Sequence, residues 1–235
     1  MKDTTVYNGM QHEVDYEVLA PGIHVYHNAL PKEMNIIERT HKTLEMPGTR
    51  FKWKQAELNF GHEDLTHRKC MDFKIKDDAT LGPVDQYSED MHKMYKEIID
   101  RLKLCISHYA PKNYLAGINY FECINIVRYG SGEFFKVHTD DGEPYRCTLS
   151  AVGYPNDDYE GGELYFPLFD VKYKPKAGDF VINPSAYSYA HSSEPVTDEG
   201  IKYSLVIMTD RNEFAHRNDS PTYYPVEYRS ANGVV

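Results

Sequence analysis

Hydrophobic and polar positions divide the chain into a first part with helical character and a second part rich in strands. The chain opens with a lead-in, and GIHVYHNALP (residues 22–31) is expected to form a strand. The next segment, PKEMNIIERTHKTLEM (31–46), is predicted to be a helix. Pro31 stands before its first turn, where proline is tolerated, and Pro47-Gly48 follows its end as a stop signal.

A longer amphipathic helix is expected from Ser88 to about Tyr109. Ser88 stands at its start, where serine is favoured, and Pro111 is expected to stop it. Apolar side chains at helical spacing form one face of this helix, which should pack against a core. These residues are Met91, Met94, Tyr95, Ile98, Ile99, Leu102 and Ile106.

After Asn113 the pattern changes to short β-type runs separated by Gly, Pro, Asn and Asp. The runs are YFECINIVRY, EFFKVHTD, RCTLSAVGY, GELYFPLF, DFVINPS and YSLVIMTD. Such a series predicts a mainly β fold, a sandwich or barrel, with the two helices covering one face. From about residue 213 the chain shows no periodicity, and this tail is expected to wrap over the surface or to be partly disordered.

Composition and charge narrow the class of protein. A chain of 235 residues with 41% hydrophobic and 26% charged residues can form one domain with a substantial core. Its formal net charge of -10 argues against non-specific binding to nucleic-acid phosphates. The four cysteines are widely spaced, which predicts reduced thiols and neither a disulfide framework nor a zinc ribbon. The pattern of a signal peptide or a membrane span is missing, so we expect a cytoplasmic location without membrane association.

Two side chains that can bind a metal stand close together in FFKVHTD. If this segment is a strand running into a turn, His138 and Asp140 project to the same side, because side chains alternate along a strand. His191 follows a later predicted turn and strand and is the natural third ligand. Two histidines and one carboxylate on one face of an octahedral ion form the facial triad of non-haem Fe(II) oxygenases, which leaves positions open for other ligands.

A single basic residue, Lys202, leads into an otherwise apolar predicted strand. Such a lysine can simply reach solvent at the strand end, which is the commoner case for lysine. It can also neutralise an anion inside the barrel. The presence of His138, Asp140 and His191 upstream, in suitable order and spacing, favours the second interpretation.

The chain contains a second H-x-D pattern, His62-Glu63-Asp64, in a polar stretch between the predicted helices. Neither a G-G-E-L segment nor a later histidine and basic residue follow it at suitable spacing. We therefore interpret this pattern as a loop or strand end and not as part of a metal site.

Taken together, these segments resemble the Fe(II)/2-oxoglutarate-dependent dioxygenases, and within them the prolyl 4-hydroxylase-like branch. The similar strings, which fall in residues 118–210, are INIVRYGSGEFFKVHTD, LSAVGYPNDDYEGGELYFP, KAGDFVINP and AHSSEPVTDEGIKYSLVIMTD. The resemblance implies a double-stranded β-helix (jelly-roll) core with N-terminal helices packed on one face. It implies a single dioxygenase domain, with a helix-containing part at about 1–115, the catalytic core at about 118–212 and a tail at 213–235.

The resemblance also assigns roles to individual positions of this sequence. The implied residues are the Fe(II) ligands His138, Asp140 and His191, the 2-oxoglutarate-binding Lys202, Tyr154 and Tyr129, and Arg146 as a residue that touches the substrate. A dicarboxylate held inside a barrel needs a fixed positive charge, and a lysine with a tyrosine hydroxyl can supply charge-assisted hydrogen bonds.

The implied activity is hydroxylation of a substrate C–H bond, with release of succinate and CO2 and with ascorbate as reductant. The resemblance favours peptidyl proline in a peptide or protein as substrate. Alternatives are a 2-oxoglutarate oxygenase that acts on another amino acid, a small metabolite or an alkylated base, and a non-catalytic jelly-roll protein that binds a metal for stability. Lys202 distinguishes the last alternative, because a structural metal site needs no anchor for a cosubstrate.

Overall fold

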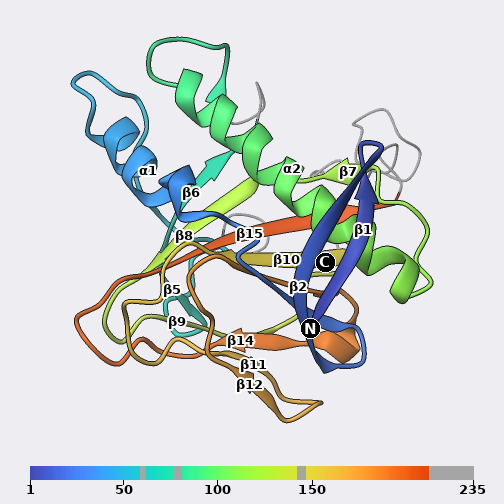
Figure 1. Ribbon diagram of the computed structural model, residues 1–235. Helices are drawn as coiled ribbons and strands as arrows, with labels where there is room; N and C mark the ends of the chain where they lie inside the picture. The colour runs from blue at the N-terminus through green and yellow to red at the C-terminus, as the bar shows by residue number, and fades with distance from the viewer. Residues whose placement is uncertain (59–61, 77–80, 142–146, 212–235) are drawn as a thin grey trace, which may run out of the picture.

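The structure, a computed structural model, describes residues 1–58, 62–76, 81–141 and 147–211 (Figure 1). Ten strands of this part form one antiparallel sheet in the order β1-β2-β3-β13-β10-β15-β8-β6-β4, with β7 paired to β15. These strands are β1 (Lys2–Tyr7), β2 (Met10–Ala20), β3 (Ile23–His27), β4 (Lys54–Gln55), β6 (Met71–Ile75), β7 (Tyr120–Phe121), β8 (Ile124–Tyr129), β10 (Leu149–Tyr154), β13 (Asp179–Pro184) and β15 (Lys202–Asp210).

A smaller antiparallel sheet has the order β12-β11-β14-β9-β5. Its strands are β5 (Arg68–Lys69), β9 (Phe134–His138), β11 (Leu164–Phe166), β12 (Val171–Tyr173) and β14 (His191–Ser193). Val152 and Val181 of the larger sheet share one buried cluster with Leu164 and Phe166 of the smaller sheet, so the inner faces of the two sheets pack together. This arrangement is the mainly β, jelly-roll core that the sequence predicted.

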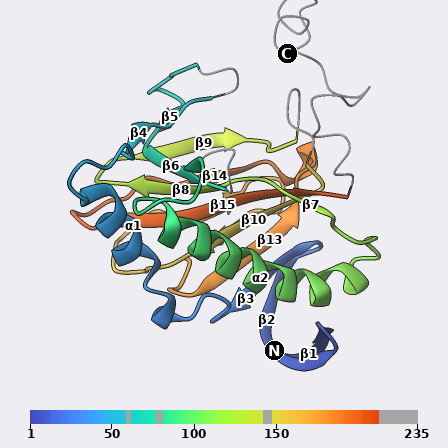
Figure 2. The same ribbon diagram turned by 90° about the horizontal axis from the view of Figure 1, so that it is seen from above.

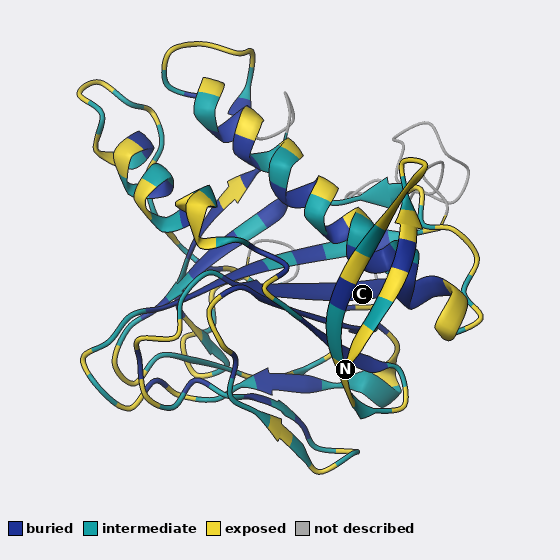
Figure 3. Ribbon diagram, in the orientation of Figure 1, coloured by how far each residue is buried: buried dark blue, intermediate teal, exposed yellow. Residues whose placement is uncertain are grey.

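Helices α1 (Ile36–Glu45) and α2 (Glu89–Lys112) lie on the other face of the larger sheet (Figure 2). The apolar face of α2 joins a large buried cluster with residues from β6, β8, β10, β13 and β15. Figure 3 shows the middle strands of the larger sheet as mostly buried, and buried and exposed residues alternating along α2. The helices therefore stabilise the outer face, and the inner face is left to line the space between the sheets.

The predicted apolar face of α2 is confirmed, with one exception. Six of the seven predicted residues are buried, whereas Tyr95 is only partly buried. The prediction that Pro111 stops the helix is wrong, because the helix continues to Lys112 and includes Pro111 in its last turn. A proline there removes one backbone donor, and the N–H of Asn113 still bonds to the carbonyls of Tyr109 and Ala110.

The first predicted helix begins later than expected. Residues Lys32–Met34 form a short 3-10 turn, and Asn35 adopts a left-handed conformation with φ of 47°. The α-helix then starts at Ile36. Asparagine tolerates this conformation better than most residues, so it can separate the two turns at low cost.

The opening, which the sequence analysis described only as a lead-in, forms a β-hairpin. β1 pairs with β2 from Lys2 opposite Asp15 to Tyr7 opposite Met10. Asn8 and Gly9 form the turn, with φ angles of 50° and 75°. Two central residues with positive φ define the turn that matches the twist of paired strands, and Asn-Gly is its most favourable sequence.

All four cysteines are free thiols, as the sequence predicted. Neither helix in the described part of the chain combines the length and the apolar character needed to cross a bilayer. The tail from residue 213, whose course was predicted above, lies outside the described residues.

Candidate active site

The structure brings His138, Asp140 and His191 together. His138 is the last residue of β9 and His191 is the first residue of β14, and the two strands pair so that these residues are opposite each other. Asp140 follows two residues after β9. One ligand atom from each of the three side chains lies within 4.8 Å of the others, and no second group of this kind occurs in the described ranges.

Backbone hydrogen bonds orient both imidazoles. The Nδ1 atoms of His138 and His191 lie 2.8 Å from the carbonyl of Lys136 and 3.1 Å from the carbonyl of Tyr189. A carbonyl can only accept, so each Nδ1 carries the proton and donates. In a neutral imidazole this arrangement leaves Nε2 as the nitrogen that can bind a metal, and each Nε2 lies 3.6 Å from a carboxylate oxygen of Asp140. Metal-binding histidines typically have their second nitrogen fixed in this way.

The donor set fits a divalent cation. Ligands at about 2.1 Å and at right angles around an ion are roughly 3 Å apart, and each histidine Nε2 lies 3.6 Å from a carboxylate oxygen of Asp140. The Oδ2 atom of Asp140 is buried and has no hydrogen-bond partner. A buried carboxylate oxygen without a partner is costly, and a metal ion between the three side chains would satisfy it.

Burial and neighbouring groups set the protonation of this site. Burial lowers the pKa of the His138 imidazole to about 3, which keeps it neutral and able to bind a metal. Burial alone would raise the pKa of Asp140, but the adjacent imidazoles of His191 and His138 and a hydrogen bond from Ser150 outweigh it. The pKa of Asp140 is therefore lower than usual, and the carboxylate stays ionised.

Lys202 is a buried cation on the inner face of the larger sheet. Only 1% of it is exposed, and its Nζ donates to the carbonyl of Gly162 at 2.7 Å and to the hydroxyl of Ser193 at 2.6 Å. Within the described ranges no carboxylate forms a salt bridge with it, and burial lowers its pKa to about 7. An anion bound beside Nζ would offset this unfavourable burial of charge.

Two tyrosines surround the amine of Lys202. Tyr129 on β8 is directly opposite Lys202 in the sheet register, and the Nζ atom is 5.0 Å from its ring centroid. The ring of Tyr154 on β10 is 5.6 Å from the same atom. Both tyrosines are almost fully buried. The three residues that the sequence linked to 2-oxoglutarate thus lie together, and their role in binding it stays a prediction.

Gly162, the second glycine of the G-G-E-L segment, allows close packing against Lys202 and Tyr159. Gly162 has φ of 65°, and a Cβ atom there would lie 3.0 Å from the side chain of Lys202 and 2.9 Å from the ring of Tyr159. A larger residue would be strained and would displace the lysine.

Sequence reasoning missed several neighbours of the site. The ring of Phe135 stacks on the imidazole of His138, with centroids 3.6 Å apart and an interplanar angle of 13°. The guanidinium of Arg68 lies over the same phenyl ring at 4.7 Å. Ser193, whose hydroxyl contacts Lys202, was missed as well. Arg68 is brought here by the pairing of β5 with β9, for which the short strand β5 gave no sequence signal.

Arg146 lies outside the described residues. His62 and Asp64 of the second H-x-D pattern lie in a loop, as expected, and do not join the three-residue cluster.

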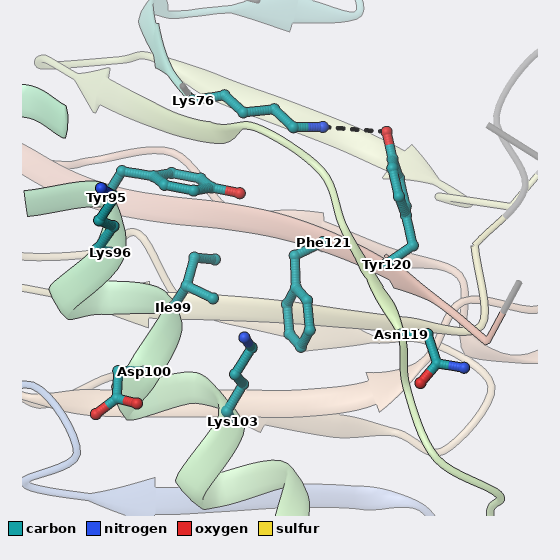
Figure 4. Close-up of a pocket in the computed structure, with 9 residues that line it drawn as sticks. All are labelled: Lys76, Tyr95, Lys96, Ile99, Asp100, Lys103, Asn119, Tyr120 and Phe121. Atoms are coloured by element: carbon teal, nitrogen blue, oxygen red, sulfur yellow. Dashed lines mark hydrogen bonds between the residues drawn. The ribbon is translucent and has the colours of Figure 1, made fainter. Parts of the chain in front are cut away.

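A groove of about 500 Å³ lies on the outer face, between α2 and the segment that contains β7 (Figure 4). Figure 4 shows lysine, tyrosine and phenylalanine side chains around it, with Lys76 bonded to the hydroxyl of Tyr120. None of its lining residues belongs to the cluster around His138 and Lys202. The groove is therefore distinct from the candidate active site.

Comparisons with known proteins agree with this geometry. The family model of the 2OG-Fe(II) oxygenase superfamily matches residues 124–209, the segment that contains the triad and Lys202. That superfamily uses Fe(II) and 2-oxoglutarate, and ascorbate is a typical reductant of its prolyl hydroxylases. A search of curated proteins found no match to the chain.

Several solved structures with a similar fold are prolyl hydroxylases. One is a prolyl hydroxylase from Trichoplax adhaerens in complex with a hypoxia inducible factor peptide fragment, with 16% identity, coverage of 82% of this chain and 84% of that chain, and a TM-score of 0.61. A prolyl-4-hydroxylase from Pseudomonas putida has 20% identity, coverage of 82% and 94%, and a TM-score of 0.60.

A third is the viral collagen prolyl hydroxylase from Paramecium Bursaria Chlorella virus-1, in its 2OG complex, with 18% identity, coverage of 80% and 95%, and a TM-score of 0.53. At these identities the likeness concerns the fold. Residues 124–209 thus match the family model of the 2OG-Fe(II) oxygenase superfamily, and the chain has the fold of solved prolyl hydroxylases.

Proposed function

We propose that this protein is an Fe(II)- and 2-oxoglutarate-dependent dioxygenase that hydroxylates a substrate C–H bond, with peptidyl proline as the substrate and succinate and CO2 as products. The observation that carries the proposal is the buried Lys202, which has no carboxylate partner among the described residues. It lies between the two tyrosines and donates a hydrogen bond to Ser193, two residues after His191. A protein that held a metal only for stability would gain nothing from such a cation.

His138, Asp140 and His191 would hold the iron from one side and leave its other positions to ligands. When bound, Fe(II) supplies the redox chemistry that converts 2-oxoglutarate and O2 into succinate and CO2 and places a hydroxyl group on the substrate carbon. The carboxylate of Asp140 would be one of the ligands of the ion and would balance part of its charge.

Lys202 would bind the distal carboxylate of 2-oxoglutarate through a charge-assisted hydrogen bond. The hydroxyls of Tyr154 and Tyr129 would add hydrogen bonds to the same cosubstrate. The part of the site around Lys202 would exclude water, because buried residues of β8, β10 and β15 form its walls. Reaction would then be confined to the face of the iron that the substrate can reach.

The proline-containing substrate is supported by the fold shared with prolyl hydroxylases and by the peptide in the Trichoplax adhaerens complex. A contact of Arg146 with the substrate is part of the proposal and rests on the resemblance of the sequence segment after Asp140 alone.

The test is an anaerobic titration with Fe(II) and 2-oxoglutarate, followed by O2 and measurement of succinate with and without proline-containing peptides. Succinate that increases with peptide, together with hydroxyproline in the peptide, supports the full proposal. Succinate formation that no peptide stimulates would support an oxygenase but would reject peptidyl proline as its substrate. Complete absence of metal-dependent succinate would instead identify a non-catalytic metal-binding protein.

A further inference from the structure

Strand β9 contains an irregularity directly before the candidate iron ligand at its end. His138 is opposite His191 on β14, and Phe135 is opposite Ser193. Three steps along β9 therefore correspond to two steps along β14, so β9 carries one extra residue, which defines a β-bulge. Bulges re-aim side chains and are frequent next to active sites.

The bulge brings the side chains of Phe135 and His138 to the same side of the strand. In a regular strand, residues three positions apart project to opposite faces. Here the two rings are stacked, with centroids 3.6 Å apart and 13° between their planes. The two residues between them, Lys136 and Val137, are both exposed, whereas a regular strand would turn one of them inward. The bulge thus places an aromatic ring flat against a candidate metal ligand.

Two contacts determine the orientation of the His138 imidazole. Its Nδ1 donates to the carbonyl of Lys136, a residue of the bulge. This hydrogen bond fixes which nitrogen faces the backbone, and the stacked ring of Phe135 fixes the plane of the imidazole. As a result Nε2 lies on the side of Asp140, 3.6 Å from its carboxylate.

The second histidine of the site is held differently. The side chain of His191 is 7% exposed, and the ring of Phe166 lies 5.4 Å away at 44°, so it does not stack on the imidazole. The side chain of His138 is 17% exposed and has fewer neighbours to confine it. The orientation of His138 therefore depends more strongly on one defined contact, the stacked ring of Phe135.

Phe135 is itself held by residues of the preceding strand segment. Arg68 is directly opposite it in the pairing of β5 with β9, and the guanidinium lies 4.7 Å from the centre of the phenyl ring. The imidazole of His67 contacts the same ring nearly edge-on, at 5.9 Å and 81°. The phenyl ring cannot turn without disturbing these contacts, so it offers the imidazole of His138 a fixed surface.

We propose that Phe135 is a positioning residue for the metal site, whose ring holds the imidazole of His138 in the plane in which Nε2 can bind the ion before the ion arrives. This inference rests on the proposed function, because it requires a metal ion at His138, Asp140 and His191. Loss of the flat ring should weaken metal binding, although Phe135 offers no ligand atom of its own.

The experiment measures the dissociation constant and the visible absorption spectrum of Co(II) bound to the full-length protein without 2-oxoglutarate. Phe135→Leu keeps an apolar side chain but removes the ring. It should raise the dissociation constant about tenfold or more, as is typical when a contact that orients a metal-binding histidine is lost. The Co(II) spectrum should change as well, because it reports the arrangement of the ligands. Phe135→Tyr keeps the ring and should retain the wild-type affinity and spectrum.

Phe134→Leu is the matched control, because it makes the same substitution at the neighbouring position of β9, whose side chain projects to the other face. Its Co(II) affinity should equal that of the wild type. In a protein that carries His138→Ala, Phe135→Leu should cause no further loss, because positioning acts only through that imidazole. Thermal melts of the metal-free proteins establish that each variant is folded, and Phe135→Met replaces Phe135→Leu if the latter unfolds.

The outcomes separate this inference from the proposed function. If the wild type binds Co(II) and Phe135→Leu shows the same affinity and spectrum, only the positioning role is overturned. The same conclusion follows if Phe134→Leu or Phe135→Tyr loses as much affinity as Phe135→Leu, or if Phe135→Leu weakens the His138→Ala protein further. If the wild type neither binds Co(II) nor forms metal-dependent succinate, the proposed function fails, and this inference fails with it.

Discussion

The contacts of Lys202 indicate that its side chain can bind an anion. Both of its hydrogen bonds go to uncharged oxygens, those of Gly162 and Ser193. A buried ammonium group with only such partners is less stable than one with a carboxylate, which is reflected in its lowered pKa of about 7. The same feature makes the residue easy to test, because binding of a dicarboxylate should depend on its charge.

Replacement of Lys202 should affect the cosubstrate and not the metal. We expect Lys202→Ala to raise the KM for 2-oxoglutarate about 100-fold or more, since it removes one partner of a buried ion pair. Lys202→Arg keeps the charge and should retain part of the affinity. Titration with Co(II), followed by its visible absorption, should give the same metal affinity in all three proteins. An unchanged KM in Lys202→Ala would remove this residue from the cosubstrate site.

The affinity for 2-oxoglutarate should also depend on pH. With a pKa of about 7 in the free protein, the amine of Lys202 is charged below pH 7 and loses its proton as the pH rises through that value. The bound carboxylate requires the charged form, so the dissociation constant should increase about tenfold per pH unit above 7. Anaerobic calorimetry between pH 6 and pH 9 measures this. Lys202→Arg, whose guanidinium stays charged, should show a flat profile over the same range.

Among the elements, α2 contributes most of the helical surface that covers the larger sheet. Its buried residues include Leu102, which is fully inaccessible. The exposed Lys96 lies on the same helix and serves as a comparison. Helices of this kind are stabilised mainly by packing of the apolar face, so the two positions should differ strongly.

We expect Leu102→Ala to lower the free energy of unfolding by about 2 to 5 kcal/mol, because it leaves a cavity in the core. Lys96→Ala should change it by less than about 0.5 kcal/mol. Urea denaturation followed by circular dichroism measures both. Comparable losses for the two variants would mean that the helix does not pack as described.

Different elements were predictable for different reasons. The central strands and the apolar face of α2 follow from local periodicity, and the triad could be assembled because His138 and Asp140 share one strand end. The N-terminal hairpin was also readable from Asn8-Gly9, but its turn signal was overlooked. By contrast, β5 has two residues, and Arg68 reaches the site only through pairing with β9. Such long-range pairing of a very short strand leaves no periodic pattern in the sequence.

In the whole molecule, the candidate metal site connects the two sheets. His138 and His191 belong to neighbouring strands of the smaller sheet. The segment after β9, which carries Asp140, is held by a hydrogen bond from the N–H of Asp141 to the carbonyl of Ser185, just after β13 of the larger sheet. A metal ion bound by all three ligands would therefore restrain both sheets, and its effect on stability should exceed a purely local one.

Metal binding should accordingly raise the unfolding temperature. At a free Co(II) concentration of 100 times the dissociation constant, the native state should gain about 2.7 kcal/mol. For a chain of this size each kcal/mol corresponds to roughly 2 to 4 °C. Chelation should reverse the gain, and Asp140→Ala should lose it, because the carboxylate is the ligand with an unsatisfied buried oxygen. Addition of 2-oxoglutarate to the metal-loaded protein should give a second increment that is absent in Lys202→Ala. If the increment with 2-oxoglutarate persisted in that variant, or if Asp140→Ala kept the full metal effect, the triad and the lysine would not form one site.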